Sequence, residues 1–338
     1  MTTTERNIHL GLLGASLAVA VWVFGAQPHA GEPATHGGAL SSAADERSPL
    51  AIIPAGSAFL LSADLRAFTR SPLGAFIAER LERSAGASKL VALCGFDPLA
   101  RLDQLALAIP SANLAAQEHP EDFGIVARGR FSATEITRCA SAAITARGGE
   151  AIQTKLGSFD SIRDRKASSG EIASKDGLLV VSGGSYLREL LDSAEGRRGP
   201  NGQDVRDARH VELRRALGPG ALLATWLLGE SWFERVTGDA TNARLSPLKA
   251  LKSVAARIEV QQRAELLVLL DCVDSEGATS IASLLGELRS SLDALPLDPA
   301  FAGIAKRTTV SQTGARLKLG LELNQAELSH VLDALLGS

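Results

Sequence analysis

The sequence is poor in the residues that build aromatic or redox sites. Its 338 residues include ten phenylalanines, three tryptophans, one tyrosine and three cysteines. So few aromatic rings exclude the stacking platforms on which sugar-binding and single-strand-binding surfaces depend. The formal net charge of −3 leaves no basic field for nucleic acid or for an anionic membrane surface. We therefore predict no nucleic-acid partner.

The spacings of known catalytic and metal sites are also missing. The sequence has no HExxH, P-loop, GxGxxG or CxxC. Residues 183–187 (GGSYL) come nearest to a hydrolase motif, with Ser185 as nucleophile, but the final glycine of GxSxG is absent. A capped turn between a strand and a helix explains them equally well. We expect His210 and His330 on charged helix surfaces, and predict no catalytic, cofactor-binding or metal-binding residue.

Residues 10–26 (LGLLGASLAVAVWVFGA) are 17 positions without a charge. As a helix they would reach about 26 Å, close to the lower limit for crossing a bilayer. Cutting after Ala26 or Ala30 would place Phe24 or Pro28 where a cleavable signal needs a small residue. We therefore predict a signal anchor over residues 1–26, with the lipid bilayer as its partner. The alternatives are a cleaved signal, with secretion to the periplasm, and a buried soluble helix.

Charge around this segment predicts its orientation. Arg6 precedes it, and no Lys or Arg follows before Arg47. This bias favours a cytoplasmic amino terminus. We expect a single-pass protein of the inner membrane, with the bulk of the chain in the periplasm.

The remainder reads as a linker and two lobes. Residues 27–50 are rich in Pro, Gly, Ser and Ala and predict a flexible linker. Apolar residues make up 45% of the chain and charged residues 22%, as in ordinary globular proteins. Residues 196–202 (GRRGPNG) would interrupt any helix or strand. We predict a first lobe over residues 51–200 and a second over 205–338.

Hydrophobic periodicity predicts an α+β fold. Residues 316–324 (RLKLGLELN) alternate with period two, and Asn324 then caps a helix over 325–336. Residues 264–273 (AELLVLLDCV) are apolar on both faces, which predicts a central strand covered on both sides.

Short sequence segments that recur in both halves suggest an internal duplication. Ser-Pro-Leu occurs at residues 71–73 and 246–248. Other short similarities occur in the same order along both halves. We therefore predict two similar lobes, each an antiparallel sheet with helices on one face, in the order β-α-β-β-α-β-β-α. Chance similarity in a sequence rich in Ala and Leu is the alternative.

Two of the three cysteines are candidates for a disulfide. Cys139 shares a core-facing helical stripe with Ile136 and Ala140, and Cys94 ends an apolar run. In an oxidising compartment these two are the natural pair. Three separate buried thiols are the alternative, and Cys272 is expected to be a small buried hydrophobe.

Residues 94–100 (CGFDPLA), the strand at 104–110 and the later Cys139 resemble a family of uncharacterised signal-anchored proteins from high-GC Gram-negative bacteria. The likeness covers about residues 50–230. It implies an envelope location, supports the pairing of Cys94 with Cys139, and implies no activity.

Our leading hypothesis is a non-catalytic envelope module that binds a protein partner or a small apolar ligand. Paired lobes often meet at a cleft, and we would place a ligand near Phe59, Trp226 and Trp232. Packing at the start of a helix is the alternative for Trp232. The competing functions are an envelope hydrolase, with Ser185 or a carboxylate pair, and a structural spacer.

Overall fold

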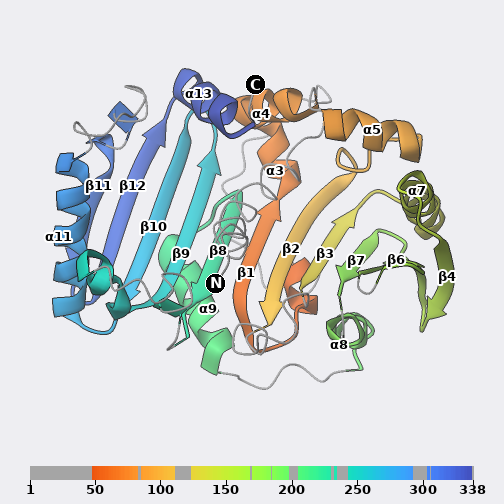
Figure 1. The fold of residues 1–338 in the computed structure, drawn as a ribbon, viewed down its shortest axis with the longest axis horizontal. Coiled ribbons are helices and arrows are strands. Elements are labelled where there is room, and N and C mark those ends of the chain that lie inside the picture. The colour runs from red at the N-terminus through yellow and green to blue at the C-terminus, as the bar shows by residue number, and fades with distance from the viewer. Residues whose placement is uncertain are drawn as a thin grey trace. The chain divides into compact units, whose positions relative to one another are not determined.

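The computed structural model describes residues 48–82, 85–110, 123–167, 170–183, 185–197, 205–229, 232–233, 243–291, 303–304 and 306–336 (Figure 1). Two compact units divide between Ala208 and Arg209, and we call them the N-terminal and the C-terminal unit. The predicted anchor at residues 10–26 lies outside the described residues. Within the described part, no helix combines the length and the apolar character needed to cross a membrane.

The N-terminal unit is built on an antiparallel sheet. Its strands run in the order β1-β2-β3-β7-β6-β5-β4 (Figure 1). A 3-10 helix, η1, precedes the first strand and buries Pro49 and Ile52, so it begins inside the predicted linker over residues 27–50. In chain order the elements are η1 (Pro49–Ile52), β1 (Ser57–Asp64), α3 (Leu65–Arg70), α4 (Pro72–Glu82), α5 (Ala85–Cys94), β2 (Leu102–Pro110), β3 (Gly124–Gly129), α7 (Ala133–Ala146), β4 (Ala151–Leu156), β5 (Phe159–Asp164), β6 (Glu171–Lys175), β7 (Leu178–Ser182) and α8 (Tyr186–Ala194).

Helices pack on both faces of this sheet. On one face, Leu190 of α8 lies in a core cluster with Val126 and Val180. On the other face, Ile144 of α7 packs against Ile162 of β5. Each cluster takes its strand residues from alternating positions, as the period of a strand requires.

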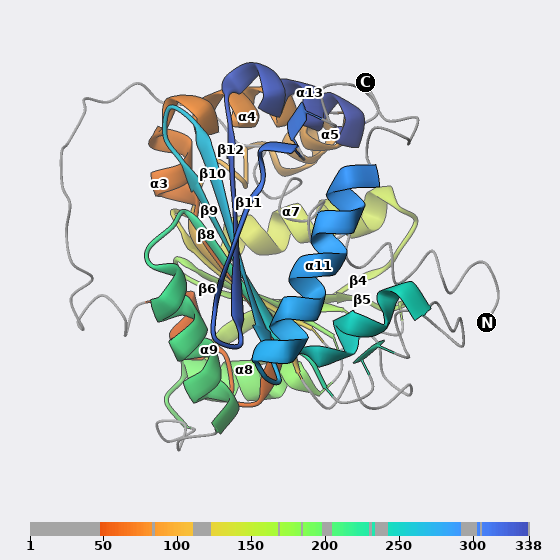
Figure 2. The same cartoon turned by 90° about the vertical axis from the view of Figure 1, so that its left-hand side faces the viewer.

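The C-terminal unit is built on five antiparallel strands, in the order β8-β9-β10-β12-β11. Strand β10 is central, and Figure 2 shows α9 and α11 on opposite sides of these strands. Leu213 and Leu217 of α9 cover one face, and Ala278 and Ile281 of α11 cover the other. The elements are α9 (Val205–Leu217), β8 (Leu222–Leu227), η2 (Ala243–Ala250), β9 (Leu251–Val260), β10 (Ala264–Cys272), α11 (Ser275–Ser291), β11 (Thr309–Thr313), β12 (Arg316–Leu323) and α13 (Gln325–Leu336).

The α+β class predicted from the sequence is confirmed, and so is the central position of β10. The layering differs from the prediction, because helices cover both faces of each sheet. Strands such as β10 bury apolar side chains on both faces, so helices on one side alone would leave the other apolar face in water.

The two units share one strand order. The order β1-β2-β3-β7-β6 in the N-terminal unit corresponds to β8-β9-β10-β12-β11 in the C-terminal unit. The predicted element order therefore holds for the C-terminal unit, with η2 as its first helix. The N-terminal unit carries an additional hairpin, β4–β5, at the edge of its sheet. The duplication itself stays a prediction.

Candidate functional site

A groove of about 770 Å³ lies between α7 and the β4–β5 hairpin, and we call it the α7 groove. Residues from one helix and two strands line it, and most are small or carry a hydroxyl group. They are Thr134, Thr137, Arg138, Ser141, Ala142, Thr145, Ala146, Gln153, Thr154, Asp160 and Ser161. This lining offers hydrogen bonds to a ligand, beside the methyl and methylene groups of the same residues.

Helix α7 is fixed at its start by a capping box. Ser132 Oγ accepts from the Glu135 backbone N–H (3.2 Å), and Glu135 Oε2 accepts from the Ser132 backbone N–H (2.9 Å). The opposite stripe of the helix, including Ile136 and Ile144, is buried. The groove-facing stripe is therefore left with small and polar residues.

The hairpin beside α7 closes through a two-residue turn. Leu156 pairs with Phe159, and Gly157 between them has φ 61°, the backbone region that glycine occupies without strain. Glu195, next to α8, accepts from the Ser158 backbone N–H (2.8 Å) and hydroxyl (2.6 Å). These two hydrogen bonds are the main reason that the pKa of Glu195 lies below its ordinary value. The carboxylate fixes the tip of the hairpin.

Strand β4 forms the outer edge of the sheet and pairs only with β5 in the described part of the chain. Since Leu156 and Phe159 close the turn, Leu156, Thr154 and Ile152 exchange hydrogen bonds with β5. The Arg165 N–H donates to the Glu150 carbonyl (2.8 Å), so every second residue from Leu156 back to Glu150 is hydrogen-bonded toward the sheet. The backbone groups of Ala151, Gln153 and Lys155 therefore point away from the sheet.

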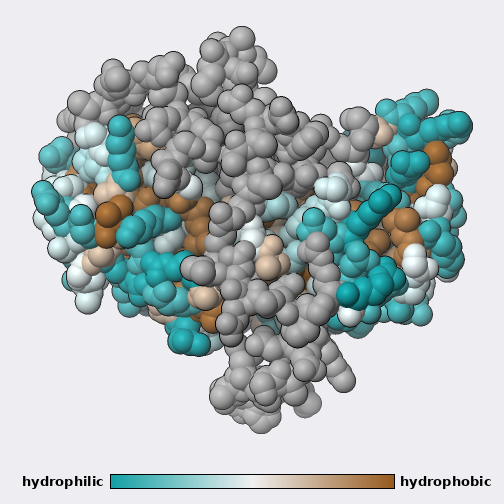
Figure 3. Space-filling view, turned by 90° about the horizontal axis from the view of Figure 1, so that it is seen from below, coloured by the Kyte–Doolittle hydropathy of each residue, from teal (hydrophilic) through white to brown (hydrophobic). Residues whose placement is uncertain are grey.

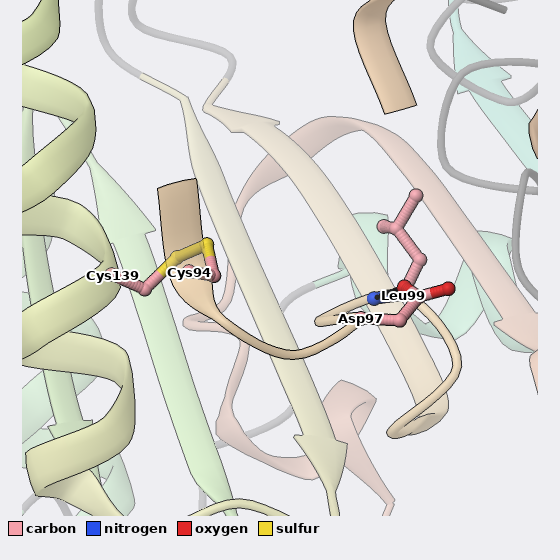
Figure 4. The surroundings of a disulfide bond; sticks show 4 residues. All are labelled: Cys94, Asp97, Leu99 and Cys139. Atoms are coloured by element: carbon pink, nitrogen blue, oxygen red, sulfur yellow. Dashed lines mark hydrogen bonds between the residues drawn. A yellow bond between two sulfur atoms is a disulfide. The ribbon is translucent and has the colours of Figure 1, made fainter. Parts of the chain in front are cut away.

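A disulfide joins α7 to the end of α5, which confirms the predicted pair. Cys94 and Cys139 have Cα atoms 4.2 Å apart and are separated by 45 positions in the sequence. Figure 4 shows the bond beside the turn that leads into β2. In that turn Asp97 Oδ1 accepts from the Leu99 N–H (2.9 Å) and the Ala100 N–H (3.1 Å). Residues 94–100 thus form a short, internally bonded connection.

A second contact joins this connection to α7. The Arg101 guanidinium lies 4.5 Å from the centre of the Phe96 ring and donates to Glu135 Oε1 (2.7 Å). The Ser132 backbone N–H, then Arg101, lower the pKa of Glu135 to about 2. The wall of the α7 groove is therefore held by a covalent bond and a charged contact.

The C-terminal unit has a groove of about 560 Å³ with a different chemistry. Its charged side chains pair with one another: Arg257 with Glu265 (3.5 Å), Arg263 with Glu322 (3.3 Å) and Arg307 with Glu327 (2.5 Å). These contacts satisfy most of the charges that a ligand would use.

A charged cluster around the buried Asp271 lies between α9 and the strands of the C-terminal unit. Asp271, 4% exposed, accepts from Arg316 Nε (2.5 Å), Arg209 Nη2 (2.7 Å) and Ser253 Oγ (3.2 Å). Arg316 also donates to Glu212 (3.1 Å), and hydrogen bonding to Asp271 raises the pKa of the Arg316 guanidinium. The cluster joins a helix to two strands and is occupied by its own partners.

Several residues singled out in the sequence have structural roles. His210 is buried, 2% exposed, with Nδ1 2.7 Å from Thr225 Oγ1, so the expectation of a surface histidine was wrong. It lies in α9, whose other inward residues meet the sheet. Cys272 is buried and unbonded as expected, and burial raises the pKa of its thiol.

The candidate ligand residues do not converge within either unit. Phe59 is a half-buried residue of β1 in the N-terminal unit. Trp226 lies on β8 opposite Val254, and Trp232 packs against the α11 core cluster with its ring edge-on to Phe233. The packing alternative for Trp232 is thus the one observed.

Ser185 is exposed at the start of α8. Among the described residues, no three His, Cys, Asp or Glu side chains are placed to hold a metal ion.

No model of a known protein family and no curated protein matches the sequence. Among solved structures the chain is similar to "Structure of crystal form III of TP0453" (TM-score 0.48, 10% identity, 85% of this chain and 98% of that chain). It is also similar to "Structure of crystal form I of TP0453" (TM-score 0.42, 11% identity, 85% and 97%).

Proposed function

We propose that this chain is a membrane-tethered module of the bacterial envelope, exposed to the periplasm, which binds a protein partner. The observation that carries the proposal is the disulfide between Cys94 and Cys139. Such bonds form and persist in oxidising compartments, and the periplasm is one. The uncharged run at residues 10–26 supplies the tether, and the charge bias around it favours export of the chain beyond residue 26.

The shape and chemistry of the described grooves favour a protein segment over a small apolar ligand. Sites for small ligands are mostly apolar and bury most of the ligand. The α7 groove is lined by hydroxyl and amide groups, and the C-terminal groove by paired charges. Described hydrophobic residues on the face in Figure 3 lie in small groups among hydrophilic ones. An open groove that presents hydrogen-bonding groups suits a segment with its own backbone hydrogen-bonding groups.

Nothing positive indicates catalysis. Ser185, the one residue in a hydrolase-like context, is exposed at a helix start. We therefore assign it no catalytic role. Turnover of ester or peptide substrates that is lost on Ser185→Ala would contradict this assignment.

The first experiment tests compartment and disulfide together. The full-length protein is alkylated without reductant under denaturing conditions, and its mass is measured. We expect one labelled thiol, Cys272, and three after reduction. Three labels without reduction, or recovery of the full-length chain from the cytosol, would contradict the proposal.

The second experiment tests partner binding. A short-range cross-linker is applied to intact cells, and the chain is recovered under denaturing conditions. We expect a discrete adduct with another protein. Recovery of the monomer alone, at a cross-linker dose that captures a known envelope complex, would count against a protein partner.

A further inference from the structure

We propose that the outer edge of β4 receives an extended, acidic segment of a partner protein, which adds a strand to the N-terminal sheet and lies along the α7 groove. This inference rests on the proposed function, because it names the surface and the kind of partner. The juxtaposition that carries it is a strand edge, unpaired by any described residue, next to the α7 groove. Peptides that add to a sheet edge gain affinity from backbone hydrogen bonds and specificity from side chains.

The edge is suited to pairing. Strand β4 is six residues long, contains no proline, and pairs with β5 without a register shift. Proteins usually block such edges with proline, a bulge, a covering element or an unpaired lysine. The only lysine here, Lys155, is engaged by Asp160 on the neighbouring strand. The outward N–H and C=O groups of Ala151, Gln153 and Lys155 are therefore presented as a template.

The hairpin is also where the strands of the two units differ. Both sheets share five strands in one order, and only the N-terminal sheet continues into β5 and β4. The added hairpin forms one wall of the α7 groove. The disulfide and the Arg101–Glu135 contact hold the other wall in place. Such a preformed site lowers the ordering cost of binding.

Charge in the groove indicates the chemistry of the segment. Arg138 of α7 lines the groove, is exposed, and pairs with no carboxylate of the described residues. Asp160, also in the lining, is neutralised by Lys155. One positive charge is thus left over, among hydroxyl groups on Thr134, Ser141 and Thr145 of the same helix. An extended segment with an acidic residue and small polar side chains complements this surface.

The other described sheet edge supplies a control. Strand β11 is an edge with every residue exposed, and it closes onto β12 through a two-residue turn after Thr313. By the same alternation, Val310 and Gln312 point their backbone groups outward. Neither of the two grooves described above is lined by Val310 or Gln312. Val310→Pro therefore matches Gln153→Pro, since each removes one outward N–H from an edge strand, where proline is tolerated.

The probe is a random dodecapeptide library displayed on phage and selected on the full-length chain in mild detergent. We expect enrichment of peptides with Asp or Glu among Ser, Thr and Asn. Their affinities are then measured by fluorescence anisotropy. Gln153→Pro should weaken binding by about tenfold or more, whereas Val310→Pro should change it by less than about twofold.

Two further variants keep the test valid if a proline disturbs folding. Arg138→Glu should weaken the acidic peptides by about tenfold, and Ala142→Gln should weaken all of them by filling the groove. Both substitutions suit an exposed or half-exposed helix position. Equal weakening by Gln153→Pro and Val310→Pro, or no effect of Arg138→Glu, would overturn the proposal.

Amide hydrogen exchange gives a readout specific to strand addition. Bound peptide should protect the N–H groups of Gln153 and Lys155, which point outward, and leave that of Thr154, already bonded to β5, unchanged. Unchanged exchange at Gln153 and Lys155 would overturn strand addition. Protection before any peptide is added would show that the edge is occupied by a second copy or by another segment of this chain, and would also overturn it.

Cross-linking of the Gln153→Pro variant in cells separates the two proposals. Loss of the wild-type adduct supports both the partner and its site. An adduct that persists in Gln153→Pro leaves partner binding standing and removes β4 as its site. Absence of any adduct from the wild-type protein, together with peptide binding that passes the tests above, would remove the proposed function and leave the edge site standing.

Discussion

Arg101 donates from Nη1 to Glu135 Oε1 at 2.7 Å. Glu135 lies in α7, four positions before Cys139. The carboxylate also accepts the capping hydrogen bond from the Ser132 N–H, and its pKa falls to about 2. The start of α7 is therefore held by one side chain that joins a helix cap to a neighbouring turn.

This carboxylate predicts an acid-sensitive contact. Its pKa is depressed in the folded protein, so its contribution to stability is fully present above the ordinary value of 4.5. That contribution is lost as the pH falls from about 4.5 to about 2. A carbon-detected NMR titration of Glu135 should place its midpoint near the lower value.

The matched comparison is Glu135→Gln against Glu150→Gln. Glu150 pairs with Arg165 at 2.9 Å on the exposed surface. Unfolding midpoints measured between pH 5 and pH 2.5 should converge for the wild type and Glu135→Gln as the pH falls. An equal response of the two variants would contradict the role given to Glu135.

The disulfide should contribute a large part of the stability of the N-terminal unit. Closing a loop between positions separated by 45 residues is worth about 4 kcal/mol on a chain-entropy model. The double variant Cys94→Ser/Cys139→Ser should lose stability of that order in denaturant unfolding. Reductant should lower the midpoint of the wild type and leave that of the double variant unchanged. A reductant effect in the double variant would point to other chemistry.

Removing the buried carboxylate of the C-terminal unit should be costly. Asp271→Asn leaves Arg316 and Arg209 next to a neutral, buried group, and we expect a loss of about 3 kcal/mol. Glu212→Gln changes a half-exposed member of the same cluster and should cost less than about 1 kcal/mol. Urea unfolding followed by far-ultraviolet circular dichroism measures both. Similar losses would mean that burial does not set the effect.

Two hairpin glycines offer a paired test of backbone strain. Gly157 (φ 61°) and Gly314 (φ 58°) each follow the last residue of a strand, and alanine in this conformation costs about 1 kcal/mol. A Cβ at Gly157 would also lie 2.7 Å from Glu195 Oε1, whereas a Cβ at Gly314 would meet nothing within 4 Å. Gly157→Ala should therefore lower the thermal midpoint more than Gly314→Ala. The opposite order would show that Glu195 moves away freely.

Local sequence patterns predicted the elements whose signal lies within one segment. The alternation at residues 316–324 became β12, and Asn324 Oδ1 accepts from the Glu327 N–H (3.0 Å) at the start of α13. The apolar run at residues 264–273 became β10, covered on both faces. In each case periodicity and capping act over about a dozen residues, the range that a single sequence reveals.

Features that depend on long-range register were missed. Asp271 and Arg316 are brought together by the pairing of β10 with β12 across 45 positions, and nothing local marks either residue. The hairpin at residues 151–164 mixes polar and apolar side chains with no sharp alternation, so it was not predicted. His210 looked solvated among charges, but the sheet covers it. Whether a helix face is buried depends on the elements that pack on it. The sequence of the helix alone does not identify those elements.

The position of the disulfide determines how early in synthesis of the chain the bond can form. Cys94 leaves the ribosome well ahead of Cys139, and strands β4 to β7 are synthesised later still. The bond therefore cannot close until α7 has been synthesised. Once closed, it joins the end of α5 to α7 and encloses β2 and β3 in one covalent loop, whereas β4 to β7 lie outside that loop.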